Sequence, residues 1–261
     1  PFIGYQFLRR WVAGFDAAAV AGTYGSVSAV PFVTAVQYLE NQGISYGGHM
    51  AAGMALMESP AIIMAVVIAN GLRQNTRTAP MGLQADGTAM LGTAPKAGVS
   101  MGKILHESFT DGAQLLLLGA MAVGLFTGES GKAAMQPFSV DLFKGMLAFF
   151  LLDMGLMAAR NFSQVRGKSP VLLAYAVLGP LVHASLALGM AWLLALPVGD
   201  AALLMVLAAS ASYIAVPAVL RYAIPEANPS LYFGLSLGVT FPLNILLGIA
   251  LYTQLAQAVL G

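Results

Sequence analysis

The chain alternates between long apolar stretches and short polar connections. Within each stretch the hydrophobic residues follow one another without the two-residue alternation of a barrel strand, so the pattern favours helices. Each stretch is close to the length of about 20 residues that a helix needs to cross a bilayer. The complete apolar segments are residues 17–39, 49–70, 104–126, 140–159, 171–196, 201–222 and 230–259. The pattern predicts an all-α, polytopic membrane protein with seven complete spans.

Residues 1–8 are apolar but too short to cross a bilayer, and Arg9 and Arg10 follow them directly. We interpret this segment as the tail of a truncated span, so that the N-terminal part of the protein is missing from the sequence.

Two of the spans contain an internal break. The first break lies in GTYGSVSAVP at residues 22–31, and the second in ASASYIAVP at residues 209–217. Both have two serines ahead of an identical Ala-Val-Pro, and Pro31 and Pro217 remove a backbone donor and disfavour a continuous helix. Freed backbone at membrane depth is tolerated only where it is buried in protein or lines a polar cavity. Two breaks at matching positions are typical of a transporter's binding site.

Composition supports a membrane protein. Hydrophobic residues make up 58% of the chain and charged residues 9%, with a mean hydropathy of +0.78, whereas about a quarter of the residues in a soluble domain are charged. Cysteine is absent, which excludes disulfides and thiolate metal sites. The net charge of +1 gives no indication of nucleic-acid binding, and we expect none.

The placement of Lys and Arg predicts the orientation. Threading the spans in order puts ten basic residues on one side and only Lys132 and Lys144 on the other. We therefore expect a multi-pass protein of the plasma (inner) membrane, with the Gly-, Thr- and Pro-rich linker at residues 71–103 in the cytoplasm and the C-terminus outside. The ten residues are Arg9, Arg10, Arg73, Arg77, Lys96, Lys103, Arg160, Arg166, Lys168 and Arg221.

The order of features indicates an internal repeat. Each break is followed by a polar loop and by a span with a proline near its middle, Pro60 in the first case and Pro242 in the second. We predict an incomplete first repeat at residues 1–70 and a second repeat at residues 104–261, joined by the linker. Five spans per repeat would make the two repeats inverted in the membrane, with the two discontinuous helices crossing.

A helix that stops and restarts exposes carbonyls at one end and amides at the other. The amide end attracts anions and the carbonyl end attracts cations. Ser26, Ser28, Ser210 and Ser212 would add hydroxyls, and no Lys or Arg lies near either break. This combination suits a small, weakly charged anion bound together with a cation. The alternative, that the serines and prolines only allow close helix packing, stays open.

Ionisable residues within spans are usually functional. Glu58, one turn from Pro60, is our first candidate for sodium coordination or proton coupling, whereas Asp153 either serves coupling or pairs with Arg160. Asn244 can supply an amide oxygen to a cation. We expect mid-span His183 to be structural rather than a proton relay. Glu107, Asp111 and Gln114 share one helix face, where Glu107 is expected at the interface.

Enzymatic and ATP-driven functions find no support. The sequence has no Walker motif, no Gly-x-Ser-x-Gly elbow and no His-Glu-x-x-His zinc site. We expect no catalytic residues and no cofactor. An intramembrane enzyme would need Glu58 paired with His183 or Asp153, which lie on separate spans. A non-transporting scaffold or sensor would not need two matched breaks.

These residues resemble those of the sodium-dependent bicarbonate transporter family, the SbtA-like permeases. The matches run through nearly the whole chain except the linker. Tyr213 and Glu58 stand in regions where well-studied members have an aspartate. The matching residues include Gly25-x-Val27-Ser28, Glu40-x-Gln42-Gly43, Pro180-Leu181-x-His183, Ile224-Pro225, Ala227-Asn228-Pro229-Ser230 and Leu247-Gly248-Ile249.

The resemblance implies ten spans in two inverted repeats, a homotrimer, sodium-coupled uptake of bicarbonate by alternating access, and a PII-like cytoplasmic regulator. A sodium- or proton-coupled carrier of another small organic anion is the alternative. The substrate would lie between the broken helices, at Gly25, Ser26, Val27, Ser28, Ser210, Ser212 and Tyr213. The candidate sodium and coupling residues are Thr23, Glu58, Asp153, Thr240 and Asn244.

Overall fold

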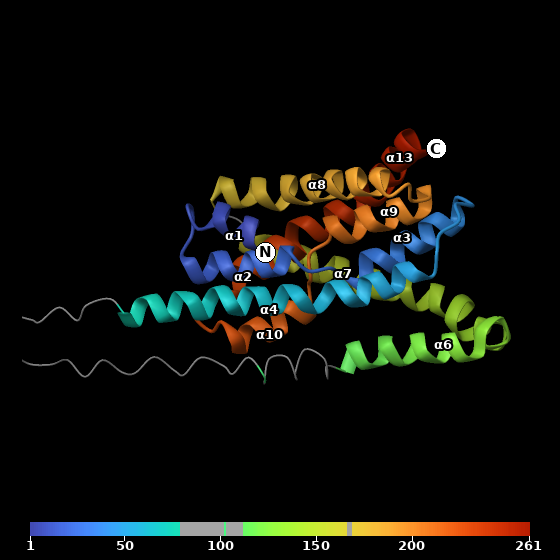
Figure 1. The fold of residues 1–261 in the computed structure, drawn as a ribbon, viewed down its shortest axis with the longest axis horizontal. Coiled ribbons are helices and arrows are strands. Elements are labelled where there is room, and N and C mark those ends of the chain that lie inside the picture. Colours follow the sequence, from blue (N-terminus) through green and yellow to red (C-terminus); the bar gives the residue numbers. More distant parts are fainter. Residues whose placement is uncertain (79–101, 103–111, 166–168) are drawn as a thin grey trace, which may run out of the picture.

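The computed structural model describes residues 1–78, 102, 112–165 and 169–261, and this part of the chain contains helices and no strands. The helices lie roughly along one common direction (Figure 1). The short α1 (Phe2–Leu8) comes first and packs on α2. Glu107, Asp111 and, apart from residue 102, the predicted linker beyond Thr78 lie outside the described residues. The expectation of an all-α protein is confirmed for the described residues.

Two discontinuous helices form the centre of the bundle. In the first, four residues separate α2 (Gly14–Tyr24) from α3 (Ala29–Asn41), and in the second, five residues separate α9 (Val198–Ala209) from α10 (Ala215–Ala223). Pro31 and Pro217 do not lie in the interruptions themselves. Each is the third residue of the restarted helix, where the missing N–H has no intrahelical acceptor in any case. The prolines therefore favour a helix start just after each break.

The broken helices run in opposite directions. In Figure 1, α2 and α10 lie toward one end of the bundle, and α3 and α9 toward the other. The contacts agree, since α3 packs on α9 and α10 packs on α2. Both breaks therefore lie near the middle of the bundle.

The long helix α4 (His49–Thr78) corrects one prediction. Pro60 lies inside it, and the helix continues on both sides, so the expected structural break at Pro60 is not present. Pro60 is exposed, and neighbouring groups in a membrane helix can satisfy the carbonyl that a proline leaves free. The helix also extends past Asn70 to Thr78, and residues 71–78 include no proline.

The predicted polar loop between residues 126 and 140 is helical instead. The helix α6 (Gly112–Gln136) has a kink at Gly128, whose φ of 55° and ψ of −144° are accessible mainly to glycine. The π-helical turn η1 (Pro137–Leu142) then leads into α7 (Phe143–Val165). The α6–α7 arm, formed by α6, η1 and α7, packs against two parts of the bundle, since α6 contacts α4 while α7 contacts the C-terminal segment.

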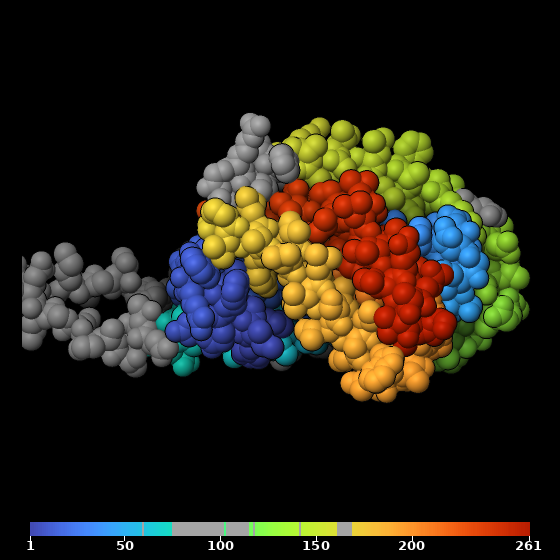
Figure 2. Space-filling model, turned by 90° about the horizontal axis from the view of Figure 1, so that it is seen from above, coloured from blue at the N-terminus to red at the C-terminus, as the bar shows by residue number. Residues whose placement is uncertain are grey.

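The C-terminal segment is a helix interrupted by two π-helical turns. Pro242 lies in the short α12 (Phe241–Leu243), between the turns η2 (Ser236–Thr240) and η3 (Asn244–Gly248). We attribute the wider turns to Pro242, which cannot donate to the preceding turn. The flanking helices are α11 (Pro229–Leu235) and α13 (Ile249–Leu260). Figure 2 shows this segment (red) between α8 (Pro170–Leu193, yellow to orange) and the α6–α7 arm (green).

Four helical stretches of the described residues are long and apolar enough to cross a membrane, and a fifth counts if α6 and α7 act as one bent span. Their windows are Gly14–Asn41, His49–Gln74, Pro170–Leu193 and Pro229–Leu260, and the bent pair is Leu118–Val140 with Phe143–Arg160. The chain is therefore a multi-pass membrane protein. The count of seven complete spans stays a prediction.

The buried core divides into two clusters on either side of the breaks. One combines α2 and α10 with α11 and includes Ala18, Val216 and Tyr232, and the other combines α3 and α9 with α13 and includes Leu203 and Tyr252. In α2 the run of alanines at residues 17–19 is fully buried, which permits the close backbone approach typical of membrane helices. This packing holds the two breaks against each other.

Candidate functional site

The two breaks are joined by direct hydrogen bonds. The amide of Ser212 in the second break donates to the carbonyl of Thr23 in the last turn of α2, at 3.0 Å. In return, the amide of Ser28 in the first break donates to Oγ of Ser210, at 3.1 Å. All four residues are buried. The sequence predicted that the two serine-containing breaks meet, and the structure confirms that they do.

The two restarted helices begin differently. At α10, whose N-cap residue is Ile214, Oγ of the earlier Ser212 accepts a hydrogen bond from the first-turn amide of Val216, at 3.1 Å. At α3, Ser28 is the N-cap residue in an extended conformation, but its side chain makes no capping hydrogen bond. The amides of Ala29 and Val30 in the first turn of α3 have no intrahelical acceptor. The N-terminus of α3 therefore has donors available for an anion.

The carbonyl ends of the broken helices are partly occupied. The carbonyl of Leu207 accepts from Oγ of Ser210, at 2.7 Å, and that of Ala209 accepts from Nδ2 of Asn244, at 2.8 Å. Oγ1 of Thr23 donates back to the carbonyl of Ala19, at 2.9 Å. These side chains tie the last turns of α2 and α9 in place.

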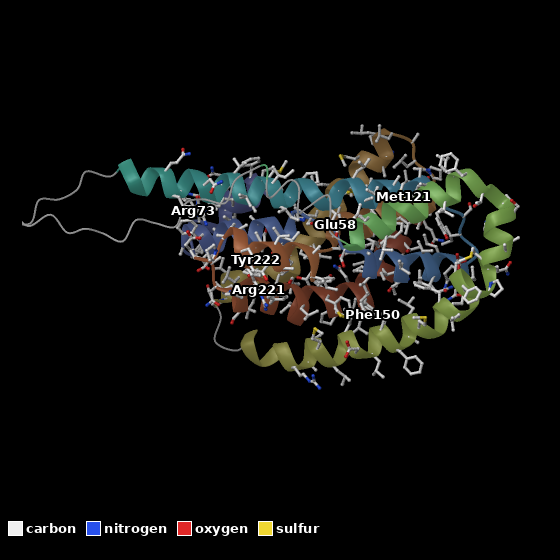
Figure 3. All side chains as sticks on the ribbon, turned by 90° about the horizontal axis from the view of Figure 1, so that it is seen from below. Glu58, Arg73, Met121, Phe150, Arg221 and Tyr222 are labelled. Carbon is white, nitrogen blue, oxygen red and sulfur yellow. The ribbon has the colours of Figure 1, made fainter. Side chains whose placement is uncertain are left out.

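Glu58 is connected to the first break through its backbone. Ser26 donates its hydroxyl proton to the carbonyl of Glu58, at 3.1 Å, and Figure 3 shows Glu58 about midway along the bundle. Its side chain is half-buried. The predicted coupling residue therefore lies on a helix that touches the first break directly.

Thr240 and Asn244, two further candidates, are buried and form hydrogen bonds that link neighbouring helices. Oγ1 of Thr240 donates to the carbonyl of Ala176 and lies 2.7 Å from the hydroxyl of Tyr24. Asn244 links the end of α9 to the hydroxyl of Tyr252, which donates to Oδ1 at 3.0 Å. Sequence reasoning missed both tyrosines. The available signal was that a buried Tyr hydroxyl needs a polar partner.

Tyr213, Gly25 and Val27 complete the predicted substrate site. Tyr213 is buried and packs edge-to-face on Phe241, with ring centroids 5.1 Å apart, and its hydroxyl has no hydrogen-bond partner among the described residues. Val27 is buried. A Cβ at Gly25 would lie 2.9 Å from the carbonyl of Ala21, so close packing requires glycine there.

The structure does not bring Asp153 to the breaks. Asp153 is exposed on α7, whereas the four serines of the two breaks are buried. His183 is half-buried in α8. The described residues contain no group of three or more His, Cys, Asp or Glu that could hold a metal ion. Besides the single carboxylate of Glu58, carbonyl, hydroxyl and amide oxygens near the breaks could hold a cation, as in discontinuous-helix transporters.

An ionic cluster at one end of the bundle was missed from the sequence, which identified Arg73 only as a basic residue. Arg73 makes two hydrogen bonds to Glu226, of 2.8 and 2.6 Å, and donates to the carbonyl of Ala223, the last residue of α10, at 2.9 Å. The hydrogen bond from Arg73 holds the pKa of the Glu226 carboxyl below its ordinary value. In Figure 3, Arg73 lies at the same end as Arg221 and Tyr222. Arg73 thus anchors the far end of the helix that begins at the second break.

Comparison with known proteins identifies the family of the chain. No curated protein sequence matches the chain. The family model described as the Na⁺-dependent bicarbonate transporter superfamily matches residues 1–257 and so includes both breaks and the C-terminal segment. With nearly its whole length matched, the chain belongs to the Na⁺-dependent bicarbonate transporter superfamily.

Proposed function

We propose that this protein takes up bicarbonate together with sodium by alternating access, with the substrate bound where the two discontinuous helices meet. Membership of the family supports a Na⁺-dependent bicarbonate transporter rather than an enzyme. The observation that carries the location is the uncapped N-terminus of α3 beside Ser210. Sodium is the coupling ion, and no cofactor takes part.

The anion would lie against the first turn of α3. The amides of Ala29 and Val30 provide donors and the helix dipole provides a favourable potential. Gly25 and Ser26 allow close approach to the backbone of the first break, while the hydroxyls of Ser28 and Ser212 and that of buried Tyr213 add donors. A singly charged, planar bicarbonate needs no arginine for such contacts, and charge-assisted hydrogen bonds to backbone amides are strong.

Sodium would bind on the carbonyl side of the breaks. Glu58 supplies the negative charge, and carbonyls at the end of α2 near Thr23 supply further oxygens. Thr240 and Asn244 would bind sodium only after releasing their present partners, which suits residues that respond to the conformational change. Asp153 would act at a distance, through the position of α7.

The opposite directions of the two broken helices support the proposal of inverted repeats (Figure 1). In such transporters one repeat moves against the other around a fixed site. We extend the proposal to a homotrimer in the plasma membrane, with residues 71–103 in the cytoplasm, the C-terminus outside and a PII-like regulator. Native mass measurement and protease protection of right-side-out vesicles test these assignments.

The decisive experiment is uptake of labelled bicarbonate into liposomes that contain the full protein. We expect uptake with an inward sodium gradient and its collapse when choline replaces sodium. Sodium-independent uptake would remove the coupling assignment. Ser26→Leu should abolish uptake, since the larger side chain would occupy the place proposed for the substrate at this buried position and removes the hydroxyl that contacts Glu58.

A second candidate substrate is another small organic anion. The buried hydroxyl and ring of Tyr213 at the second break favour it, because an aromatic wall suits a substrate with an apolar part. Competition of small carboxylates against labelled bicarbonate distinguishes the two. Stronger inhibition by a carboxylate than by unlabelled bicarbonate would favour the second candidate.

A further inference from the structure

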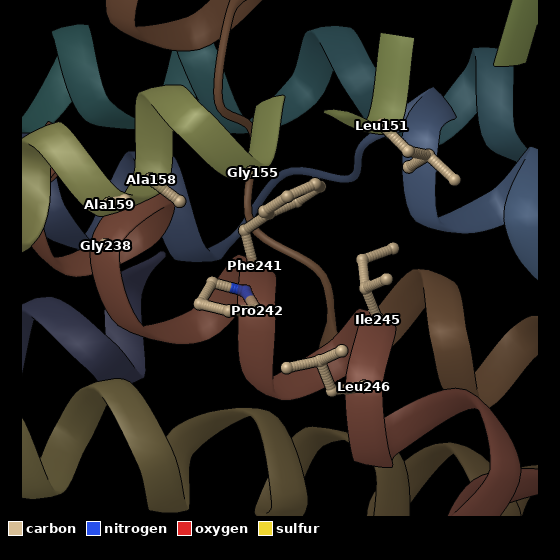
Figure 4. A pocket seen from close by; sticks show the side chains of 9 residues that line it. All are labelled: Leu151, Gly155, Ala158, Ala159, Gly238, Phe241, Pro242, Ile245 and Leu246. Atoms are coloured by element: carbon tan, nitrogen blue, oxygen red, sulfur yellow. The ribbon is translucent and has the colours of Figure 1, made fainter. Parts of the chain in front are cut away.

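Among the described residues, polar contacts join the two predicted repeats at three levels of the bundle. The central level is the pair of breaks, where the hydrogen bonds from Ser212 and Ser28 connect the two discontinuous helices. The other two levels lie near the ends of the bundle, where α2 and α9 begin (Figure 1). The cavity of about 470 Å³ between α7 and the C-terminal segment lies within the second repeat and is lined by no polar side chain, so it adds no such contact (Figure 4).

A carboxylate of the second repeat holds the chain between α3 and α4. Asp200 lies in the first turn of α9 and is only 3% exposed. One carboxylate oxygen accepts from the amide of Gly47, at 2.5 Å, and the other lies 3.4 Å from Nε2 of His49. The two segments pack closely here, since a Cβ at Gly199 would clash with the carbonyl of Ser45. We call the contacts of Asp200 with Gly47 and His49 the Asp200 latch.

A carboxylate of the first repeat makes the reciprocal contact at the opposite end. Asp16 lies in the first turn of α2, and its Oδ1 accepts from the amide of Asn228, at 2.7 Å. Asn228 belongs to the chain between α10 and α11 and is the N-cap residue of α11. We call this bond the Asp16 latch. Each latch therefore joins the start of one discontinuous helix to the chain that follows the other.

The two latches occupy equivalent positions in the sequence. Asp16 and Asp200 are each followed directly by two alanines, and Ser26 and Ser210 come ten residues after them. Each aspartate is the third residue of its helix, where the helix dipole favours a negative charge. The same pattern thus serves both discontinuous helices, whereas its contacts lie at opposite ends of the bundle. Inversion of two repeats produces this arrangement.

We propose that Asp16 and Asp200 are positioning residues for the transport cycle, each holding one end of the bundle closed while the other end opens. The proposal rests on the proposed alternating access, in which one repeat moves against the other. Movement that separates α9 from the chain between α3 and α4 breaks the Asp200 latch and leaves the Asp16 latch in place, and the opposite movement does the reverse.

The chemistry of the latches suits contacts that break and form repeatedly. Hydrogen bonds from backbone amides to a carboxylate are charge-assisted and strong while water is excluded. Water that enters an opened end hydrates the released carboxylate and amide, so only the difference between the two sets of hydrogen bonds opposes opening. A latch therefore biases the equilibrium between the two states without locking either one.

A single added cysteine reports which end is open, because the chain contains none. Ser28→Cys places it in the first break, where the side chain is buried and is reached only through an opened end. A membrane-impermeant maleimide, applied to the full protein in right-side-out and in inside-out vesicles, measures access from each face. In this background, Asp200→Ala should raise the labelling rate about tenfold from one face and lower it from the other, which corresponds to about 1.4 kcal/mol between the two states. Asp16→Ala should have the opposite effect on both faces.

The opposite signs distinguish positioning from a purely structural role, since loss of stability alone would raise labelling from both faces. Asp16→Asn keeps an oxygen that accepts from Asn228 and should be labelled as the unchanged latch is. Asp200→Asn keeps the acceptor for Gly47 but loses the charge beside His49, so its labelling should lie between those of Asp200 and Asp200→Ala. If Asp200→Ala does not fold, His49→Gln removes one contact of the latch and should shift labelling in the same direction by a smaller factor.

Glu129→Ala is the matched control, because it removes an exposed carboxylate that contacts Lys132 of the same helix, at 3.7 Å. It should leave labelling from both faces unchanged. Equal changes in Asp16→Ala and Asp200→Ala, or no change in either, would overturn the positioning role. Failure of alternating access gives a different result, since Ser28→Cys with both latches intact would then be labelled from one face only, whatever the direction of the sodium gradient.

Discussion

The amide of Ser212, in the last quarter of the sequence, donates to the carbonyl of Thr23, in the first quarter, at 3.0 Å. This bond joins the second break to the last turn of α2, the helix that precedes the first break. It makes the two breaks a single unit, because movement of one helix half displaces a backbone group of the other. The reciprocal bond from Ser28 to Ser210 closes the unit.

Ser28→Asp tests the anion position at α3. An aspartate at an N-cap favours the helix, but its negative charge occupies the place proposed for bicarbonate. We expect uptake to be lost while the thermal unfolding midpoint is unchanged or raised. Ser169→Asp is the control, because Ser169 is the N-cap of α8 and also makes no side-chain capping bond. Normal bicarbonate uptake by Ser28→Asp would exclude the α3 site.

Ser210→Ala tests the bond between the breaks. The change leaves the buried amide of Ser28 without its acceptor, which costs about 1–3 kcal/mol. We expect a lower unfolding midpoint and weaker bicarbonate binding. Ser185→Ala removes a hydroxyl that donates within an exposed part of α8, at 2.8 Å, and should change little. Equal midpoints for the two variants would show that the crossing does not depend on Ser210.

Glu58→Gln tests the sodium assignment. The amide has nearly the shape of the carboxylate but lacks its charge, so half-maximal uptake should need more sodium, with the bicarbonate dependence less affected. Glu129→Gln is the control, since Glu129 is exposed on the α6–α7 arm. If the sodium dependence of uptake is the same in Glu58→Gln and wild type, Glu58 is structural.

The Arg73–Glu226 pair predicts a pH dependence of stability. The pKa of Glu226 is lowered in the folded protein, so its stabilising contribution is complete above the ordinary value of 4.5 and is lost as the pH falls below it through the folded-state pKa. The Glu226 side chain is 38% exposed, which limits the effect to under about 1 kcal/mol.

We expect the unfolding midpoint of Glu226→Gln in detergent to fall below that of wild type at pH 7 and to approach it at acid pH. Lys132→Gln is the control, because it breaks the Lys132–Glu129 contact of 3.7 Å between highly exposed side chains. A difference that is constant from pH 7 to pH 4 would contradict the assignment to Glu226.

Tertiary packing alone explains several features that no local pattern contained. Pro60 and Pro242 look equivalent in sequence, yet α4 is continuous at Pro60 while two π-helical turns surround Pro242. Neighbouring helices decide how a free carbonyl is satisfied, so the same residue has different consequences. The ionic cluster of Arg73 and Glu226 likewise joins segments whose approach depends on the fold.

The sequence by itself determined the helical class, the membrane location and both breaks. Long apolar runs have to bury their backbone polar groups in helices within lipid, and the Ser-rich stretches before Ala-Val-Pro resist a continuous helix. Only the tertiary structure decided which groups remain available for ligands. Oγ of Ser212 accepts a hydrogen bond from the first turn of α10, whereas the side chain of Ser28 makes no capping bond at α3. Thr240 and Asn244 are already hydrogen-bonded to other helices. Hydrogen-bond partners depend on distances and angles between segments remote in sequence, which residue patterns do not contain.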